Sequence, residues 1–187
     1  MCIRDRTKIV LFVLGTTALV VISRKSLLRA RSHGFYRFFA WEILLAMFLL
    51  NAQGWFRDPL AWYQLVSWAL LIGSLVLVSL GVRQLREIGK QDQGRSDPSL
   101  LGMEKTSQLV TTGVYRYIRH PLYSSLLFLG WGMFFKSPSW LDAGLALLCT
   151  LFMTATARIE ERENIEYFGA DYEVYMRQSK MFIPWVF

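Results

Sequence analysis

The sequence is poor in the residues that build metal sites and disulfide frameworks. It contains only two cysteines, Cys2 and Cys149, and two histidines, His33 and His120, at spacings unlike those of zinc ligands. We therefore expect no metal in the functional site. Both thiols are interpreted as chemically silent, because a free cysteine commonly behaves as a small buried hydrophobic side chain.

Charged residues are also scarce, at 19% of 187 residues, whereas hydrophobic residues make up 53% and include 13 Phe and seven Trp. This apolar surplus exceeds what a soluble domain of this length buries. The net charge of +7 comes from basic residues scattered between apolar runs. Because they form no compact patch, nucleic acid is not expected as a partner. The composition predicts an all-α, polytopic membrane protein that contacts membrane lipids.

Five apolar segments are candidates for transmembrane helices. They cover residues 9–22, 38–50, 60–82, 122–135 and 140–157. The last two are joined by only residues 136–139, so we predict an antiparallel helical hairpin. We treat residues 1–187 as a single membrane domain, in which 1–8 are a non-native leader or disordered, 9–82 hold three spans, 83–120 form a loop, and 121–187 form the hairpin and a tail.

The basic residues predict an orientation in the membrane, since cytoplasmic loops carry an excess of Lys and Arg. With five spans, one side holds residues 23–37, 83–119 and everything from 158 onward. These pieces contain five, seven and four of the 21 basic residues. We therefore expect a multi-pass protein, in the inner membrane if the source is bacterial, whose tail and C-terminus are cytoplasmic.

Polar side chains gather at the two ends of the predicted hairpin. The first cluster is Thr-Thr-Gly-Val-Tyr-Arg-Tyr-Ile-Arg-His-Pro-Leu-Tyr at 111–123. Pro121 suits the first turn of a helix, where no backbone N–H is needed, so Arg119 and His120 are expected at the helix entrance. The free amides and the positive end of the helix dipole favour an anion there.

The second cluster, Arg-Ile-Glu-Glu-Arg-Glu-Asn at 158–164, follows the fifth span. If the helix continues, Glu160 and Asn164 share a face, and Arg158 and Glu161 are spaced to form an ion pair. Gly169 is expected to end this helix. Because the two spans form a hairpin, the two clusters converge at one membrane-level pocket, where ionisable groups are candidates for function.

These motifs, with Phe-Gly-x-x-Tyr-x-x-Tyr at 168–175 and Ile-Pro at 183–184, resemble the isoprenylcysteine carboxyl methyltransferase and phospholipid methyltransferase family. The resemblance covers about residues 109–184. It implies an integral membrane methyltransferase that binds S-adenosyl-L-methionine on the cytoplasmic side and methylates a lipid-like or prenylated acceptor, with carboxyl O-methylation as the expected form. Two positions depart from the family pattern: Ser125 stands where Gly is usual, and Asn164 where Leu is usual.

The resemblance also implies which residues act. The cofactor-binding residues would be Tyr115, Arg119, His120, Pro121, Tyr123, Glu160 and Glu161, and the catalytic residues Arg119, Arg158 and Glu161. The carboxylates would hold the cofactor's ammonium or ribose hydroxyls, and Arg119 and His120 its carboxylate. Arg158 would hold a substrate carboxylate or phosphate, which the guanidinium fork suits.

Three other ionisable residues are expected to have no role in the functional site. His33 is a loop histidine with no partner nearby in the sequence, and Glu163 is expected on a solvated face. Glu42 is expected at a shallow depth in the second span, from which it snorkels to the cytoplasmic interface. The aromatic tail, residues 168–187, is expected to dock on the cytoplasmic mouth of the hairpin.

The alternatives to methyl transfer are an NADPH-dependent reductase resembling the sterol reductases and a non-enzymatic membrane assembly factor.

Overall fold

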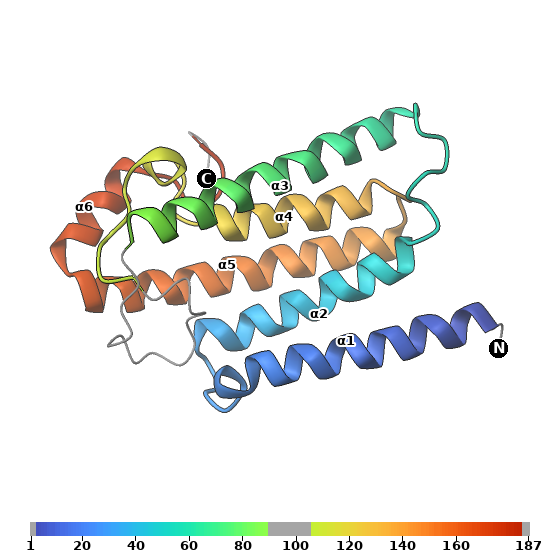
Figure 1. Cartoon of the computed structure of the whole chain (residues 1–187), viewed down its shortest axis with the longest axis horizontal. Coiled ribbons are helices and arrows are strands. Elements are labelled where there is room, and N and C mark those ends of the chain that lie inside the picture. Colours follow the sequence, from blue (N-terminus) through green and yellow to red (C-terminus); the bar gives the residue numbers. More distant parts are fainter. Residues whose placement is uncertain (1–2, 90–105, 185–187) are drawn as a thin grey trace.

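The computed structural model describes residues 3–89 and 106–184, and in these ranges the chain is helical (Figure 1). The helices are α1 Ile3–Leu27, α2 His33–Asn51, α3 Trp62–Glu87, the 3-10 turn η2 Gly113–Arg116, α4 Pro121–Phe134, α5 Trp140–Phe168 and α6 Ala170–Gln178. The described residues contain no strand, only an isolated parallel bridge between Ile118 and Lys180.

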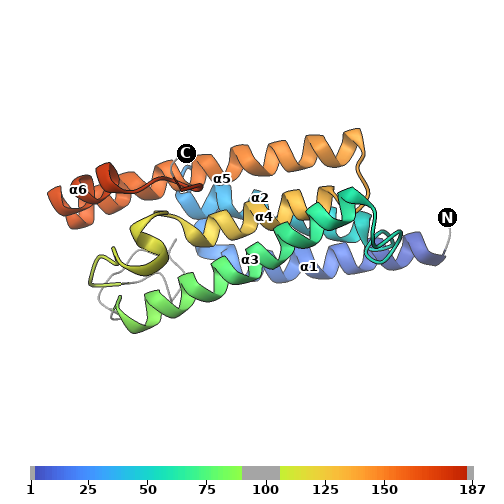
Figure 2. The same ribbon diagram turned by 90° about the horizontal axis from the view of Figure 1, so that it is seen from above.

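The five long helices run side by side in the order α1, α2, α5, α4, α3, and Figure 2 shows the same bundle from above. The packing follows this order: α2 contacts α1, α5 and α4, and α4 contacts α5 and α3. Helices α4 and α5 are antiparallel neighbours, as the short connection predicts. The C-terminal ends of α3 and α5 therefore lie at the same end of the bundle as the start of α4.

Four helices are long and apolar enough to cross a membrane: Asp5–Leu27 within α1, then α2, α3 and α5. Their outward faces are apolar, as the exposure of Leu14, Leu75 and Leu151 illustrates, and lipid is the solvent that suits them. Helix α4 has only 14 residues and is thus about 21 Å long, short of the ~30 Å hydrocarbon layer. The chain is a multi-pass membrane protein in which α4 is a shorter fifth helix.

The helices extend beyond the apolar segments that the sequence predicts. Helix α1 already begins at Ile3, so residues 3–8 are helical and not disordered, while Met1 and Cys2 lie outside the described residues. Helix α2 begins at His33 and not near Phe38. Residues 90–105 of the predicted loop 83–120 also lie outside the described residues.

Small and polar side chains bring the helices close together. Ser67 Oγ donates to the carbonyl of Gly132 and Ser74 Oγ to the carbonyl of Ser125, each at 2.7 Å, and these bonds join α3 to α4. A Cβ at Gly132 would lie 2.9 Å from Leu71 Cδ2, so a larger residue there would displace the Leu71 side chain. A core of apolar residues, including Leu44, Met133 and Met153, fills the space between α2, α4 and α5.

A buried lysine closes the bundle end that α6 does not cover. Lys136, in the α4–α5 turn, is 2% exposed, and its Nζ lies 3.5 Å from the ring centroid of Trp68. It also donates to Gln64 Oε1 at 3.0 Å. Burial lowers the pKa of this ammonium from its ordinary value. These contacts are structural and fix the turn of the hairpin.

Candidate functional site

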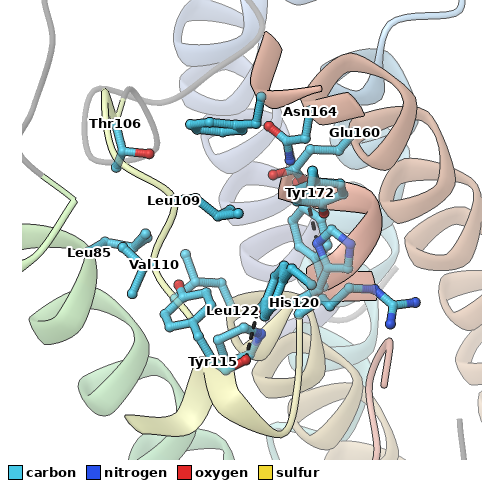
Figure 3. Close-up of a pocket in the computed structure, with 15 residues that line it drawn as sticks. Leu85, Thr106, Leu109, Val110, Tyr115, His120, Leu122, Glu160, Asn164 and Tyr172 are labelled. Carbon is cyan, nitrogen blue, oxygen red and sulfur yellow. Dashed lines mark hydrogen bonds and ion pairs between the residues drawn. The ribbon is translucent and has the colours of Figure 1, made fainter. Parts of the chain in front are cut away.

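A cavity lies at the end of the bundle where α4 begins and α5 ends (Figure 3). It is lined by side chains from α3, from the residues before α4, from α4 itself, from α5 and from α6: Leu85, Thr106, Leu109, Val110, Tyr115, Arg119, His120, Pro121, Leu122, Tyr123, Glu160, Asn164, Phe168, Tyr172 and Tyr175.

The cavity has one polar side and one apolar side. Figure 3 shows His120, Glu160 and Tyr172 grouped on one side, with Leu85 and Val110 across from them. A ligand with both an apolar and a charged part suits such a wall.

The chain that leads into α4 is tied to α3 by a glycine turn. Gly113 has φ +59°, and a Cβ there would lie 1.7 Å from Gln84 Nε2. Gln84 Oε1 accepts from the backbone N–H of Val114 at 3.0 Å. Only glycine combines this backbone conformation with so close an approach. The turn thereby places Tyr115 in the cavity wall.

Arg119 joins three segments at the base of the cavity. Its Nε donates to Glu161 Oε1 at 2.7 Å, and one terminal nitrogen donates to the carbonyls of Met176, at 3.1 Å, and Ser179. The side chains of Arg119 and Glu161 are only 10% and 8% exposed. The guanidinium thus links the start of α4 to the end of α5 and to the C-terminal end of α6.

His120 lies between two carboxylates. Its Nε2 is 3.4 Å from Glu161 Oε1, and its Nδ1 is 3.8 Å from Glu160 Oε2. The ring stacks on Tyr123, with centroids 5.4 Å apart and planes 13° apart. Among the residues that the structure describes, none makes a well-aligned hydrogen bond to His120 Nε2 or Glu160 Oε2, and these two buried atoms have the long contacts given above. Unsatisfied buried polar atoms on a cavity wall mark places where a ligand can bind.

The tail folds back and completes the cavity. Arg119 N–H donates to the carbonyl of Lys180 at 2.8 Å, and Lys180 N–H donates to the carbonyl of Tyr117 at 3.0 Å. Ser124 Oγ donates to the carbonyl of Phe182 at 2.9 Å. The predicted docking of the tail on the hairpin is confirmed as far as residue 184, and residues 185–187 lie outside the described residues.

Two tyrosines of α6 form the outer wall. Tyr172 and Tyr175 are buried, with rings in edge contact at 5.8 Å, and Tyr175 donates its hydroxyl to the carbonyl of Tyr115 at 2.7 Å. Burial raises the pKa of both phenols above the ordinary value, so they remain hydrogen-bond donors at neutral pH. Gly169, at φ +61°, ends α5 as predicted and turns the chain into α6.

The structure brings most of the predicted residues together. Tyr115, Arg119, His120, Pro121, Tyr123 and Glu160 all line the cavity, and Pro121 occupies the first turn of α4 as predicted. Glu161 lies just behind the wall and reaches the site through Arg119 and His120. Arg158 is exposed and does not line the cavity. The expected pairing of Arg158 with Glu161 is wrong, because Glu161 pairs with Arg119 across the hairpin.

The expectations for His33 and Glu163 are also wrong. His33 is fully buried in the first turn of α2, and its Nδ1 is hydrogen-bonded to Glu163 of α5. Glu163 therefore does not lie on a solvated face. The two residues are 130 positions apart, so no local pattern links them. Glu42 accepts from Thr16 Oγ1 at 2.8 Å in the α1–α2 contact.

The wall residues of α6 follow a local pattern that is visible in the sequence. Tyr172 and Tyr175 are three positions apart in a short helix after Gly169, which puts both rings on one face. That spacing predicts a buried aromatic face. Only the folded tail shows that this face borders the cavity and not the membrane.

Comparison with known proteins identifies one family model and several relatives that match parts of this chain. A family model described as phospholipid methyltransferase matches residues 62–171. Methanethiol S-methyltransferase 1 of Bradyrhizobium diazoefficiens is 32% identical over 90 residues, 46% of this chain and 30% of that protein. Methanethiol S-methyltransferase of Crocosphaera subtropica is 34% identical over 79 residues, 41% of this chain and 29% of that protein.

Protein-S-isoprenylcysteine O-methyltransferase of Saccharomyces cerevisiae is 30% identical over 128 residues, 66% of this chain and 53% of that protein. The matched regions thus span between 29% and 53% of the length of these curated relatives. No solved structure matches the chain.

Proposed function

Because this chain belongs to the phospholipid methyltransferase family, we propose that it transfers a methyl group from S-adenosylmethionine to a lipid-like acceptor in the membrane. The observation that carries the proposal is the pair of buried, unsatisfied atoms His120 Nε2 and Glu160 Oε2 on the wall of an amphipathic cavity. S-adenosylmethionine carries groups that can bind to such a wall: an ammonium and hydroxyls that donate hydrogen bonds, a carboxylate that accepts them, and a flat adenine that packs against apolar side chains.

The described residues fit this cofactor. Glu160 would accept from its ammonium or ribose hydroxyls, and His120, with the terminal nitrogens of Arg119, would face its carboxylate. The rings of Tyr115, Tyr123 and Tyr172 would enclose the adenine and the sulfonium, since aromatic faces attract cations. When bound, the cofactor supplies a methyl group on a positively charged sulfur.

The residues of this chain would act by positioning and by excluding water. Charge on the sulfur disappears during methyl transfer, so a dry cavity that aligns the two reactants accelerates the step without a strong acid or base. The Arg119–Glu161 pair would hold the start of α4 against α5 and keep His120 in place. Exposed Arg158, outside the cavity, would meet an anionic group of the acceptor.

The chemical class of the methyl acceptor is proposed from the similarity to known proteins. Carboxyl O-methylation of a prenylated or lipid-like substrate is supported by the similarity to an isoprenylcysteine O-methyltransferase. Methylation of a small thiol is the second candidate, because two relatives are named methanethiol S-methyltransferases. The bias of basic residues toward the cavity end supports a cytoplasmic location of the site.

Binding and turnover by the purified protein in lipid nanodiscs test this function. Labelled S-adenosylmethionine should bind saturably, whereas NADPH should not compete. Transfer of labelled methyl to a farnesylcysteine analogue or to methanethiol then distinguishes the two acceptor classes. Binding of NADPH with no binding of S-adenosylmethionine would favour a reductase, and binding of neither would favour a non-enzymatic assembly factor.

A further inference from the structure

The first turn of α2 contacts the same stretch of α5 that forms the polar wall of the cavity. His33, at the start of α2, is hydrogen-bonded through Nδ1 to Glu163 and is fully buried. Helices α2 and α5 pack along their length, and Figure 1 shows the start of α2 beside the last turns of α5. His33 precedes residue 62 and so lies outside the part of the chain that the family model matches, whereas Glu163 lies inside it.

Glu163 and Glu160 are three positions apart on α5, so they share one face of the helix. Glu163 faces His33, while Glu160 faces the cavity and His120. Basic side chains of α2 also act on Glu160, since Arg37, and His33 when it is protonated, interact with it electrostatically. Arg37 is 4% exposed and one turn after His33, hence on the same side of α2.

The N-terminus of α2 completes this arrangement. Its first turn contains no acidic residue, so the positive end of the helix dipole has no carboxylate of its own. Glu163, supplied by α5, takes that place. The cavity carboxylate Glu160 therefore lies between a histidine of α4 and the basic first turn of α2.

We propose that His33 is a positioning residue of the cofactor site: through Glu163 it fixes the face of α5 that presents Glu160 to the cavity. The N-terminal helices are then part of the binding machinery and not only a membrane anchor. This inference rests on the proposed function for its effect on S-adenosylmethionine. Its structural core, the coupling of His33 to His120 through the α5 carboxylates, is independent of the ligand.

The chain contains only two histidines, which makes the coupling measurable without any ligand. In nanodiscs, tag-free protein labelled with ¹⁵N-histidine gives imidazole signals from His33 and His120 alone. His33→Leu should remove one signal and shift the other, because Glu160 moves relative to His120. Glu166→Gln is the matched control, since Glu166 is an exposed α5 carboxylate that does not line the cavity, and it should shift neither. An unshifted His120 signal in His33→Leu would overturn the proposal.

Binding supplies the second measurement. His33→Leu should raise the Kd for S-adenosylmethionine about tenfold, the scale typical of residues that orient ligand-binding groups, while the KM for the acceptor stays unchanged. His33→Gln, which can still donate to Glu163, should recover most of that affinity. Equal loss in both variants, or a loss that only follows a lower Tm, would show a merely structural role. If the wild type binds no S-adenosylmethionine, the proposed function fails, and the ¹⁵N signals alone decide the coupling.

Discussion

Arg119 and Glu161 form an ion pair of 2.7 Å between residues that are 42 positions apart, one at the entrance of α4 and the other near the end of α5. The pair closes the open end of the helical hairpin as Lys136 closes the turn. Because it is nearly buried, each charge depends on the other for compensation. The pair therefore has a mainly architectural part in the site, whereas Glu160 and His120 line the cavity itself.

Removing the acidic member of this pair should destabilise the protein. Glu161→Gln leaves the Arg119 guanidinium buried without its counter-charge, which typically costs about 3 to 5 kcal/mol. We expect a clearly lower Tm in nanodiscs or mild detergent, measured by tryptophan fluorescence. Arg83→Gln, which breaks the exposed Arg83–Glu87 pair, is the control and should cost at most about 1 kcal/mol. Equal stability of the two variants would contradict the architectural role.

The atoms that face the cavity should determine cofactor affinity. Glu160→Gln and His120→Ala each remove a partner of a charged ligand from a desolvated site, which costs on the order of 2 to 5 kcal/mol and lowers affinity at least ~30-fold. Calorimetric titration with S-adenosylmethionine measures this. Arg162→Gln, an exposed neighbour on α5, should bind with wild-type affinity. If Glu160→Gln also binds normally, the cofactor lies elsewhere.

The tail should be required for binding but not for membrane insertion. Truncation after Asn164 removes Phe168, Tyr172 and Tyr175 from the wall and both carbonyl acceptors of Arg119. We expect no measurable binding of S-adenosylmethionine, with insertion shown by resistance to alkaline extraction. Tyr172→Ala should weaken binding in the full chain, whereas Val174→Ala, on the exposed face of α6, should not. If the truncated protein binds S-adenosylmethionine as tightly as the full chain, the tail serves only as an anchor and is not part of the binding site.

The two ends of the bundle should face opposite sides of the membrane. Ser137, in the α4–α5 turn, and Gln178, at the end of α6, are both exposed and lie at opposite ends of the bundle. In a Cys2→Ser background, Gln178→Cys should react with an impermeant maleimide from the cytoplasmic side and Ser137→Cys from the other. Cys149 is buried and should remain silent. Labelling of both sites from the same side would contradict the predicted topology.

Local sequence patterns predicted a large part of the fold and the site. Apolar runs and the four-residue link between them predict the α4–α5 hairpin, because a connection of that length admits only an antiparallel neighbour. Pro121 and Gly169 mark the beginning of α4 and the end of α5 through backbone constraints that depend on no distant residue. The convergence of the 111–123 and 158–164 clusters follows from the hairpin alone.

Pairings between distant residues were decided only by the tertiary structure. The local spacing predicts that Glu161 pairs with Arg158. In the structure Glu161 pairs with Arg119 instead, which is held in place by two backbone carbonyls and is shielded from water. His33 has no expected partner nearby in the sequence, and in the structure it is hydrogen-bonded to Glu163 of α5. Sequence determines which residues are apolar, where helices begin and end, and which types of side chain are present. Which buried charges meet depends on the rotation and packing of whole helices, because a buried charge is stable only beside the partner that the fold brings to it.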